Sequence, residues 1–203
     1  FGCTNLRVKN DWVKVELVKE LIKNEILVLQ TGSSQISLAK AGLLTPEAAH
    51  LAGDGLKEVC ETVGCPPVLG MGSCVDNSRI LIAAAEVVKE GGLGESIADL
   101  PAAGAAPEWM SEKAISIGHY FVASGVYTIF GATFPVTDGT KFKDLLFKGL
   151  EEQGLGTWDF AADPYEMARR MIAHIDKKRK ALGIDKARER VLFDMAARRE
   201  IAA

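Results

Sequence analysis

Short aliphatic runs alternate with longer amphipathic segments along this chain, and that alternation limits the folds it can adopt. Strands are expected at 26–29, 68–69, 99–103 and 127–132, and helices at 11–24, 35–43, 45–63, 78–89, 107–124, 141–152, 164–182 and 186–202. A strand that is followed by a helical crossover favours parallel pairing, with helices on both faces of the sheet. The sequence therefore predicts an α/β protein with a three-layer, Rossmann-like parallel sheet and a helical C-terminal extension.

Composition supports a globular protein with a substantial core, since 48% of the 203 residues are hydrophobic and 25% are charged. We expect a Rossmann-like α/β domain over residues 1–160 and a helical extension over 161–203 that packs on it. No apolar run is long enough for a membrane span and no basic-then-apolar leader opens the chain, so no membrane association and a cytoplasmic location are expected.

The basic segment 177–180 raises the question of nucleic-acid binding. Its lysines and arginine alternate with acidic residues at helical spacing, and no aromatic residues are interleaved with them. This pattern is typical of a solvated helix face, and no nucleic-acid partner is predicted.

Candidate chemistry gathers where the expected strands end. Parallel sheets present their functional residues at the carboxyl edge, and Ser33, Cys74 and the stretches 104–106 and 131–133 each follow an expected strand. Cys3 lies on another glycine turn, ahead of the first amphipathic helix. Neither a dinucleotide-binding glycine motif nor a phosphate-binding loop is present, so a nucleotide site is not supported.

Cys74 lies on a Gly-Ser turn directly before a helical run. At the start of a helix, unpaired backbone N–H groups and the helix dipole favour thiolate, and with it metal binding or nucleophilic attack. Cys60 falls on the apolar side of a predicted helix and is expected in the core, whereas Cys65 is either an incidental thiol or a ligand. A zinc ion or a simple iron–sulfur cluster bound by Cys3, Cys65 and Cys74 is therefore one open alternative.

Four segments together carry a resemblance to a known family. They are Gly-Cys-Thr-Asn at 2–5, Thr-Gly-x-x-Gln-x-x-x-Ala-Lys-Ala-Gly-Leu at 31–43, Met-Gly-Ser-Cys-Val-Asp-Asn-Ser-Arg at 71–79 and Pro-Glu-Trp-Met-Ser-Glu-Lys-Ala at 107–114. In this order they resemble the C-terminal part of the catalytic subunit of anaerobic nickel–iron carbon monoxide dehydrogenases, of the carbon monoxide dehydrogenase/acetyl-CoA synthase type.

The resemblance implies a nickel–iron–sulfur C-cluster, held by cysteines and a histidine at an interface between α/β domains. Carbon monoxide would bind nickel and hydroxide a neighbouring iron, and the products would be carbon dioxide, electrons and protons. Cys3 and Cys74 match ligand positions, and Lys113 matches a lysine that assists proton transfer and stabilises the bound carboxylate. The implied partners are the N-terminal portion of the subunit, a second copy in a homodimer and an acetyl-CoA synthase subunit.

Two departures from the family pattern alter this expectation. Ser33 stands where the family has a ligand cysteine, and a neutral hydroxyl does not replace a thiolate. Family members are also considerably longer, and the remaining portion would supply the histidine, further cysteines and the 4Fe-4S electron-transfer clusters. We therefore expect an incomplete or absent cluster and an inactive isolated chain. The alternative is a metal-free α/β scaffold or interaction module.

Overall fold

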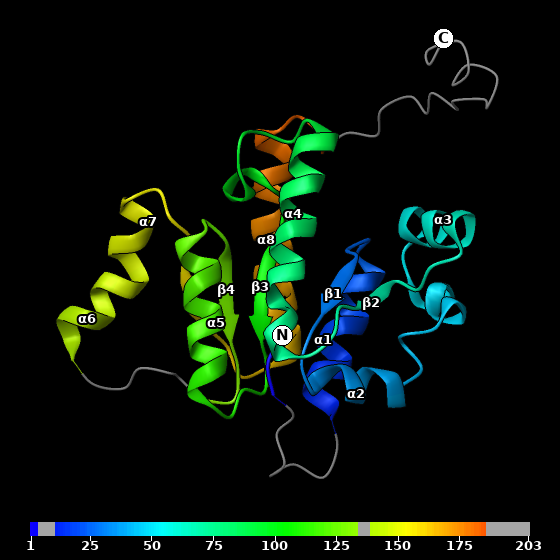
Figure 1. The fold of residues 1–203 in the computed structure, drawn as a ribbon, viewed down its shortest axis with the longest axis horizontal. Coiled ribbons are helices and arrows are strands. Elements are labelled where there is room, and N and C mark those ends of the chain that lie inside the picture. The colour runs from blue at the N-terminus through cyan, green and yellow to red at the C-terminus, as the bar shows by residue number, and fades with distance from the viewer. Residues whose placement is uncertain (4–10, 134–138, 186–203) are drawn as a thin grey trace.

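The computed structural model describes residues 1–3, 11–133 and 139–185, which form a layered α/β arrangement (Figure 1). Every strand pair in these residues is parallel: β1 pairs with β2, β3 with β4 and β4 with β5. The pairs make a two-stranded sheet, β1-β2, and a three-stranded sheet, β3-β4-β5. The strands are β1 (Val28–Gln30), β2 (Val68–Gly70), β3 (Ala103–Ala106), β4 (Tyr127–Phe130) and β5 (Trp158–Phe160).

Helices cover both faces of the sheets, as the side chains of β4 show by alternating between them. Tyr127 and Ile129 pack into the cluster that contains residues of α1 (Trp12–Lys23) and α8 (Pro164–Ala181). Phe130 packs on the opposite side, with residues of α4 (Asn77–Gly91) and α5 (Glu112–Ala123). The predicted α/β class, with parallel strands between two layers of helices, is confirmed.

Shorter helical elements complete the described chain. α2 (Ser34–Lys40) follows β1, and a third apolar cluster joins residues of α1, α2, α3 (Asp54–Val63) and β2. Cys60 belongs to this cluster and is 1% exposed, which confirms its expected place in the core. The remaining elements are the 3₁₀ helices Pro46–Leu51, Cys74–Asp76 and Ile97–Asp99, α6 (Thr140–Asp144), the π-helical segment Leu145–Gly149 and α7 (Leu150–Glu152).

The prediction of a single helix over 45–63 is wrong, because the backbone is extended at Ala52 and Gly53 and interrupts the helical geometry there. The N–H of Gly53 donates to the carbonyl of Ile22 at the end of α1, 3.0 Å away. A β-carbon at Gly53 would lie 2.7 Å from the carbonyl oxygen of Lys23. Contact with α1 therefore divides this region into a 3₁₀ helix and α3.

Two strand predictions also differ from the structure. The strand expected at 99–103 lies at Ala103–Ala106, because Ser96 and Asp99 cap a 3₁₀ turn at the position where the strand was expected to begin. β5 was not expected at all, because Asp159 interrupts its apolar residues, so it does not form an aliphatic run like those that predicted β1 and β2. The helix expected over 186–202 lies outside the described residues, and the division into 1–160 and 161–203 stays a prediction. In the part of the chain described, no helix has both the length and the apolar character needed to cross a bilayer.

His174 of α8 provides a test of this packing by pH. Its ring stacks on Tyr127, with 4.8 Å between the ring centroids. Burial, reinforced by the charges of Lys178 and Lys177, lowers the pKa of His174 from 6.5 to about 4. The unfolded chain binds this proton at a higher pH than the folded chain does, so the stability contributed by neutral His174 is present above pH 6.5 and is lost as the pH falls toward 4.

We predict that His174→Gln reduces the loss of unfolding free energy between pH 7 and pH 5, measured by urea denaturation. The matched control is His50→Gln, because His50 is exposed. Among the described residues, the one hydrogen bond given for its ring is to the Glu47 carbonyl in the same turn. Equal losses on acidification in the two variants would contradict the prediction.

Candidate functional site

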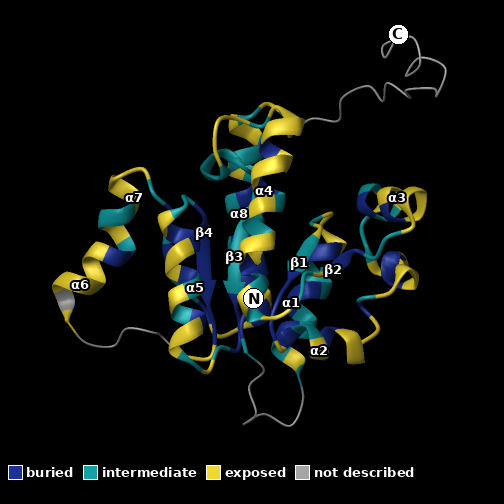
Figure 2. Cartoon of the chain, in the orientation of Figure 1, coloured by how far each residue is buried: buried dark blue, intermediate teal, exposed yellow. Residues whose placement is uncertain are grey.

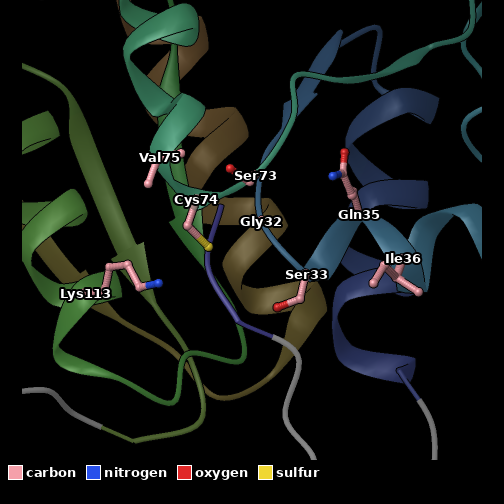
Figure 3. Close-up of a pocket in the computed structure, with 8 residues that line it drawn as sticks. All are labelled: Gly32, Ser33, Gln35, Ile36, Ser73, Cys74, Val75 and Lys113. Atoms are coloured by element: carbon pink, nitrogen blue, oxygen red, sulfur yellow. The ribbon is translucent and has the colours of Figure 1, made fainter.

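A cavity of about 390 Å³ lies at the carboxyl ends of β1 and β2 (Figure 3). Three of the predicted site residues, Ser33, Cys74 and Lys113, line it. Figure 3 shows the Lys113 side chain reaching from α5 and the Ser33 side chain from the start of α2 toward the space beside Cys74. The other lining residues are Gly32, Gln35, Ile36, Ser73 and Val75.

The turns that carry Ser33 and Cys74 are held together by backbone contacts that require glycine. The N–H of Gly32 donates to the carbonyl of Gly72 at 2.9 Å, and both glycines have positive φ, +78° and +109°. A β-carbon at Gly32 would lie 2.7 Å from the Cys74 Sγ, and one at Gly72 would lie 2.5 Å from a carboxylate oxygen of Asp76. Larger residues at either position would displace the Cys74 turn.

Cys74 lies on a turn that side chains from both ends stabilise. The Asp76 carboxylate accepts hydrogen bonds from the backbone N–H and the hydroxyl of Ser73, at 2.7 and 2.9 Å, and these bonds lower the pKa of Asp76. Asn77 is buried, donates to the carbonyl of Cys74 at 2.6 Å and accepts from the Thr31 hydroxyl at 2.8 Å. Asn77 therefore couples the Cys74 turn to the end of β1.

Lys113 lies in the first turn of α5 and is exposed. Among the described residues, the structure gives its ammonium group no ion-pair partner. A positive charge is therefore available at the rim of the cavity, where it can hold an anion or exchange a proton with a bound molecule.

Cys3 lies beside this cavity but is not part of its lining. Its Sγ is 3.4 Å from the hydroxyl oxygen of Ser111, at the start of α5. The preceding carbonyl, that of Gly2, accepts a hydrogen bond from the hydroxyl of Ser34 at 2.8 Å. A β-carbon at Gly32 would lie 2.6 Å from the same carbonyl oxygen, so Gly2 and Cys74 border one glycine.

A buried ion pair lies beneath the Cys3 backbone. Lys14 of α1 and Glu108 are 2% and 3% exposed, with 2.9 Å between Nζ and Oε2. The same ammonium group donates to the carbonyl of Cys3 at 3.2 Å. The polar face of an amphipathic helix normally faces solvent, but Lys14 is buried, and its helical spacing was the sequence signal that could have indicated this. Residues 14, 17 and 21 share one face, and Leu17 and Leu21 are in the core.

The described residues do not by themselves make an iron–sulfur site. Within them, no group of three or more His, Cys, Asp or Glu side chains gathers where a metal ion could be held. Clusters of four irons are commonly held by four cysteine thiolates, whereas this region offers Cys3 and Cys74, with Ser33 between them in sequence. Further ligands would have to come from elsewhere.

The alternative site with Cys3, Cys65 and Cys74 is wrong. Cys65 precedes β2 and Cys74 follows it, so they lie at opposite ends of that strand. Cys65 packs against the cluster that contains Cys60, whose thiol pKa is raised by burial and by Cys65. All four cysteines are free thiols.

Comparison with known sequences identifies relatives over most of the chain. The family described as "Prismane/CO dehydrogenase family" matches residues 1–165. Carbon monoxide dehydrogenase 1 of Methanosarcina mazei is 55% identical over 184 residues, which are 91% of this chain and 29% of that protein. The carbon monoxide dehydrogenase of Rhodospirillum rubrum is 37% identical over 192 residues, 90% of this chain and 30% of that protein.

Solved structures of carbon monoxide dehydrogenases also align with most of this chain. Carbon monoxide dehydrogenase from Thermococcus sp. AM4, in a nickel-free form, aligns with a TM-score of 0.84 and 49% identity over 90% of this chain and 28% of that chain. A structure of acetyl-CoA synthase/carbon monoxide dehydrogenase aligns with a TM-score of 0.82 and 33% identity, over the same shares of the two chains, 90% and 28%. This chain spans about 29% of the length of the curated relatives it matches.

We predict that Lys14→Met lowers the unfolding free energy by about 3–5 kcal/mol, because it leaves the Glu108 carboxylate buried without its partner. The Cys3 thiol should also react faster with a maleimide reagent, since its backbone loses a hydrogen bond. The matched control is Lys19→Met, which removes the partly exposed pair with Glu16 on the same helix and should cost about 1 kcal/mol or less.

The double variant Lys14→Met/Glu108→Leu separates loss of charge balance from loss of packing. It should recover most of the stability, because both buried charges are then absent. If Lys14→Met costs no more than Lys19→Met, the buried pair does not organise this region.

Proposed function

Because the chain belongs to the Prismane/CO dehydrogenase family, we propose that it is the C-terminal portion of the catalytic subunit of a nickel–iron–sulfur carbon monoxide dehydrogenase. The reaction of the complete enzyme would be CO + H₂O → CO₂ + 2 electrons + 2 protons. The observation that carries the proposal is that Ser33, Cys74 and Lys113, from three separate segments, line one cavity at the carboxyl edge. All three lie inside the matched residues 1–165.

The two cysteines are suited to hold soft metals. Thiolates are preferred ligands of iron–sulfur clusters, and Cys74 is fixed on its turn by Asn77 and by the close approach of Gly32. Cys3 and Cys74 alone do not complete a nickel–iron–sulfur cluster, and Ser33 occupies a position where the family would have a third thiolate. The isolated chain is therefore inactive in this proposal, and the rest of the subunit supplies the other ligands.

The cavity suits a small apolar substrate with a polar product. Ile36 and Val75 contribute exposed aliphatic surface to its lining, and carbon monoxide is a small molecule of low polarity. Lys113 adds a positive charge that can stabilise negative charge on an oxygen of carbon dioxide and can carry a proton away. These roles require that Lys113 act at the reacting atoms rather than in folding.

The proposal extends to partners and location. The complete subunit would work in the cytoplasm as a homodimer and would associate with an acetyl-CoA synthase subunit. A second candidate function, a metal-free α/β scaffold or interaction module, is favoured by one observation. Among the described residues, no three potential metal ligands come together.

A chimera distinguishes the two functions. We replace the equivalent segment of Methanosarcina mazei carbon monoxide dehydrogenase 1 with this chain, with and without Ser33→Cys, and assemble it anaerobically. We predict that the chimera with Ser33 contains little nickel and oxidises carbon monoxide at background rate. Ser33→Cys should raise both the nickel content measured by mass spectrometry and the carbon monoxide-dependent reduction of a viologen dye.

The matched control for the chimera is Ser78→Cys, which adds a thiol on exposed α4 outside the cavity lining. It should restore neither nickel nor activity. If the Ser33→Cys chimera folds but stays at background for both, the loss of a ligand is not the reason for inactivity, and the scaffold function is supported.

In the active Ser33→Cys chimera, we predict that Lys113→Ala lowers the rate of carbon monoxide oxidation on the order of a hundredfold, as expected when a group that transfers protons is removed. The nickel and iron content should not change, because Lys113 is not a ligand. Lys89→Ala, which removes an exposed lysine of α4, serves as the control. A proportional loss of metal and activity would instead indicate a structural role.

A further inference from the structure

The two parallel sheets lie edge to edge, and within the described residues no strand lies in the gap between β1 and β3. β1 and β3 are not hydrogen-bonded to one another. Nevertheless, Val28 of β1 and both Ala103 and Ala105 of β3 pack against the same cluster of α1 and α8 residues. The facing edges of β1 and β3 therefore lie under one pair of helices without pairing.

The first residues of the chain fill the carboxyl end of this gap. The amino group of Phe1 donates to the carbonyl of Ala105 in β3 at 2.9 Å. On the other side, the Gly2 carbonyl accepts from Ser34, just after β1, and approaches Gly32 closely. Figure 1 shows the N-terminus between β3 and the helix and strand labelled α1 and β1. Phe1 and Gly2 thus occupy the place of the last residues of an intervening strand.

The backbone groups that line the gap are set by the existing pairing. In a parallel ladder, alternate residues direct their N–H and C=O groups to opposite neighbours. The N–H of Gly131 donates to the carbonyl of Ala106, so Gly104 and Ala106 face β4, and Ala103 and Ala105 face the gap. The N–H of Val28 donates to the carbonyl of Pro67, so Leu29 of β1 likewise faces the gap. Both edges can therefore accept a strand.

Burial differs between strands with one neighbour and strands with two (Figure 2). β4, which has β3 and β5 beside it, is buried at all four residues. In β3, the residues Ala103–Ala105 are only half-buried, and so are Val28 and Leu29 of β1. The outer strands β2 and β5 are also only partly buried, so β1 and β3 have the burial of edge strands and not that of a central strand such as β4.

The amino group of Phe1 is in an environment that suits an amide better than an ammonium ion. Phe1 is 8% exposed, and its amino group donates to the Ala105 carbonyl. A peptide N–H at the same position would make the same hydrogen bond to Ala105 without placing a charge in the core.

We propose that an extended segment leading directly into Phe1 occupies the gap as a strand parallel to β1 and β3, and joins the two sheets into one. Its side chains would be aliphatic on both faces, because α1 and α8 cover one face and α4 and α5 the other. The inference rests on the proposed function in one respect, that the chain is a portion of a longer subunit. Cys3 then follows the last residue of a central strand, which would hold its thiol rigidly at the carboxyl edge.

The test uses a chain that is extended before Phe1 by about eight residues, enough for a strand, taken from the sequence that precedes the equivalent position in Methanosarcina mazei carbon monoxide dehydrogenase 1. A control extension has proline at alternate positions, which removes the N–H groups that a ladder needs. Amide hydrogen exchange is measured at Leu29 and Ala105, which face the gap, and at Gly104, which faces β4. The extension should slow exchange at Leu29 and Ala105 about tenfold more than at Gly104.

Three results would overturn the proposal. The first is unchanged exchange at Leu29 and Ala105 relative to Gly104, and the second is equal protection by the proline extension. The third is concentration-dependent protection of the unextended chain together with dimers in sedimentation, because a second copy would then be the occupant of the gap. These readouts need no metal and no activity, so they can fail or succeed independently of the Ser33→Cys chimera.

Discussion

The close approach at Gly32 is the constraint on which the rest of the site depends. A β-carbon there would lie within 2.7 Å of both the Gly2 carbonyl oxygen and the Cys74 Sγ, so three chain segments meet where no side chain fits. The hydrogen bond from Gly32 to Gly72 holds the second turn against the first. As a result, the residues that follow β1 and β2 present Ser33 and Cys74 to one cavity, and the first residues of the chain bring Cys3 beside it.

Buried polar groups fix the positions of the two turns that carry Cys3 and Cys74. Lys14 joins α1 to Glu108 and to the Cys3 carbonyl, and Asn77 joins the Cys74 turn to Thr31. Such interactions contribute less net stability than their geometry suggests, because desolvation offsets much of the attraction. Their consequence is that alternative positions of the two cysteine turns would leave buried charges and amides unsatisfied.

Prediction from sequence succeeded where a pattern was long and local. The helix at 11–24 corresponds to α1 and that at 164–182 to α8, because amphipathic periodicity over several turns is a strong signal. It failed at 45–63, where a contact between Gly53 and the end of α1 divided the helix, and at β5, where Asp159 interrupts the apolar run. For the site, Cys74, Ser33 and Lys113 could be selected from motifs. Helical spacing could indicate that Lys14 is buried, but the partners of Lys14 and Asn77, which are Glu108 and Thr31, lie far away in the chain and could not be predicted.

The sequence by itself determined the α/β class, the parallel sheet, the family and the glycine turns that carry Ser33 and Cys74. These properties follow from local periodicity and short motifs, which need no knowledge of distant contacts. Only the tertiary structure decided that Lys113 shares a cavity with Ser33 and Cys74, that Cys65 lies at the far end of β2, and that a gap separates β1 from β3. Each of these depends on the direction and order of strands in the sheets, which long-range packing decides and local sequence does not encode.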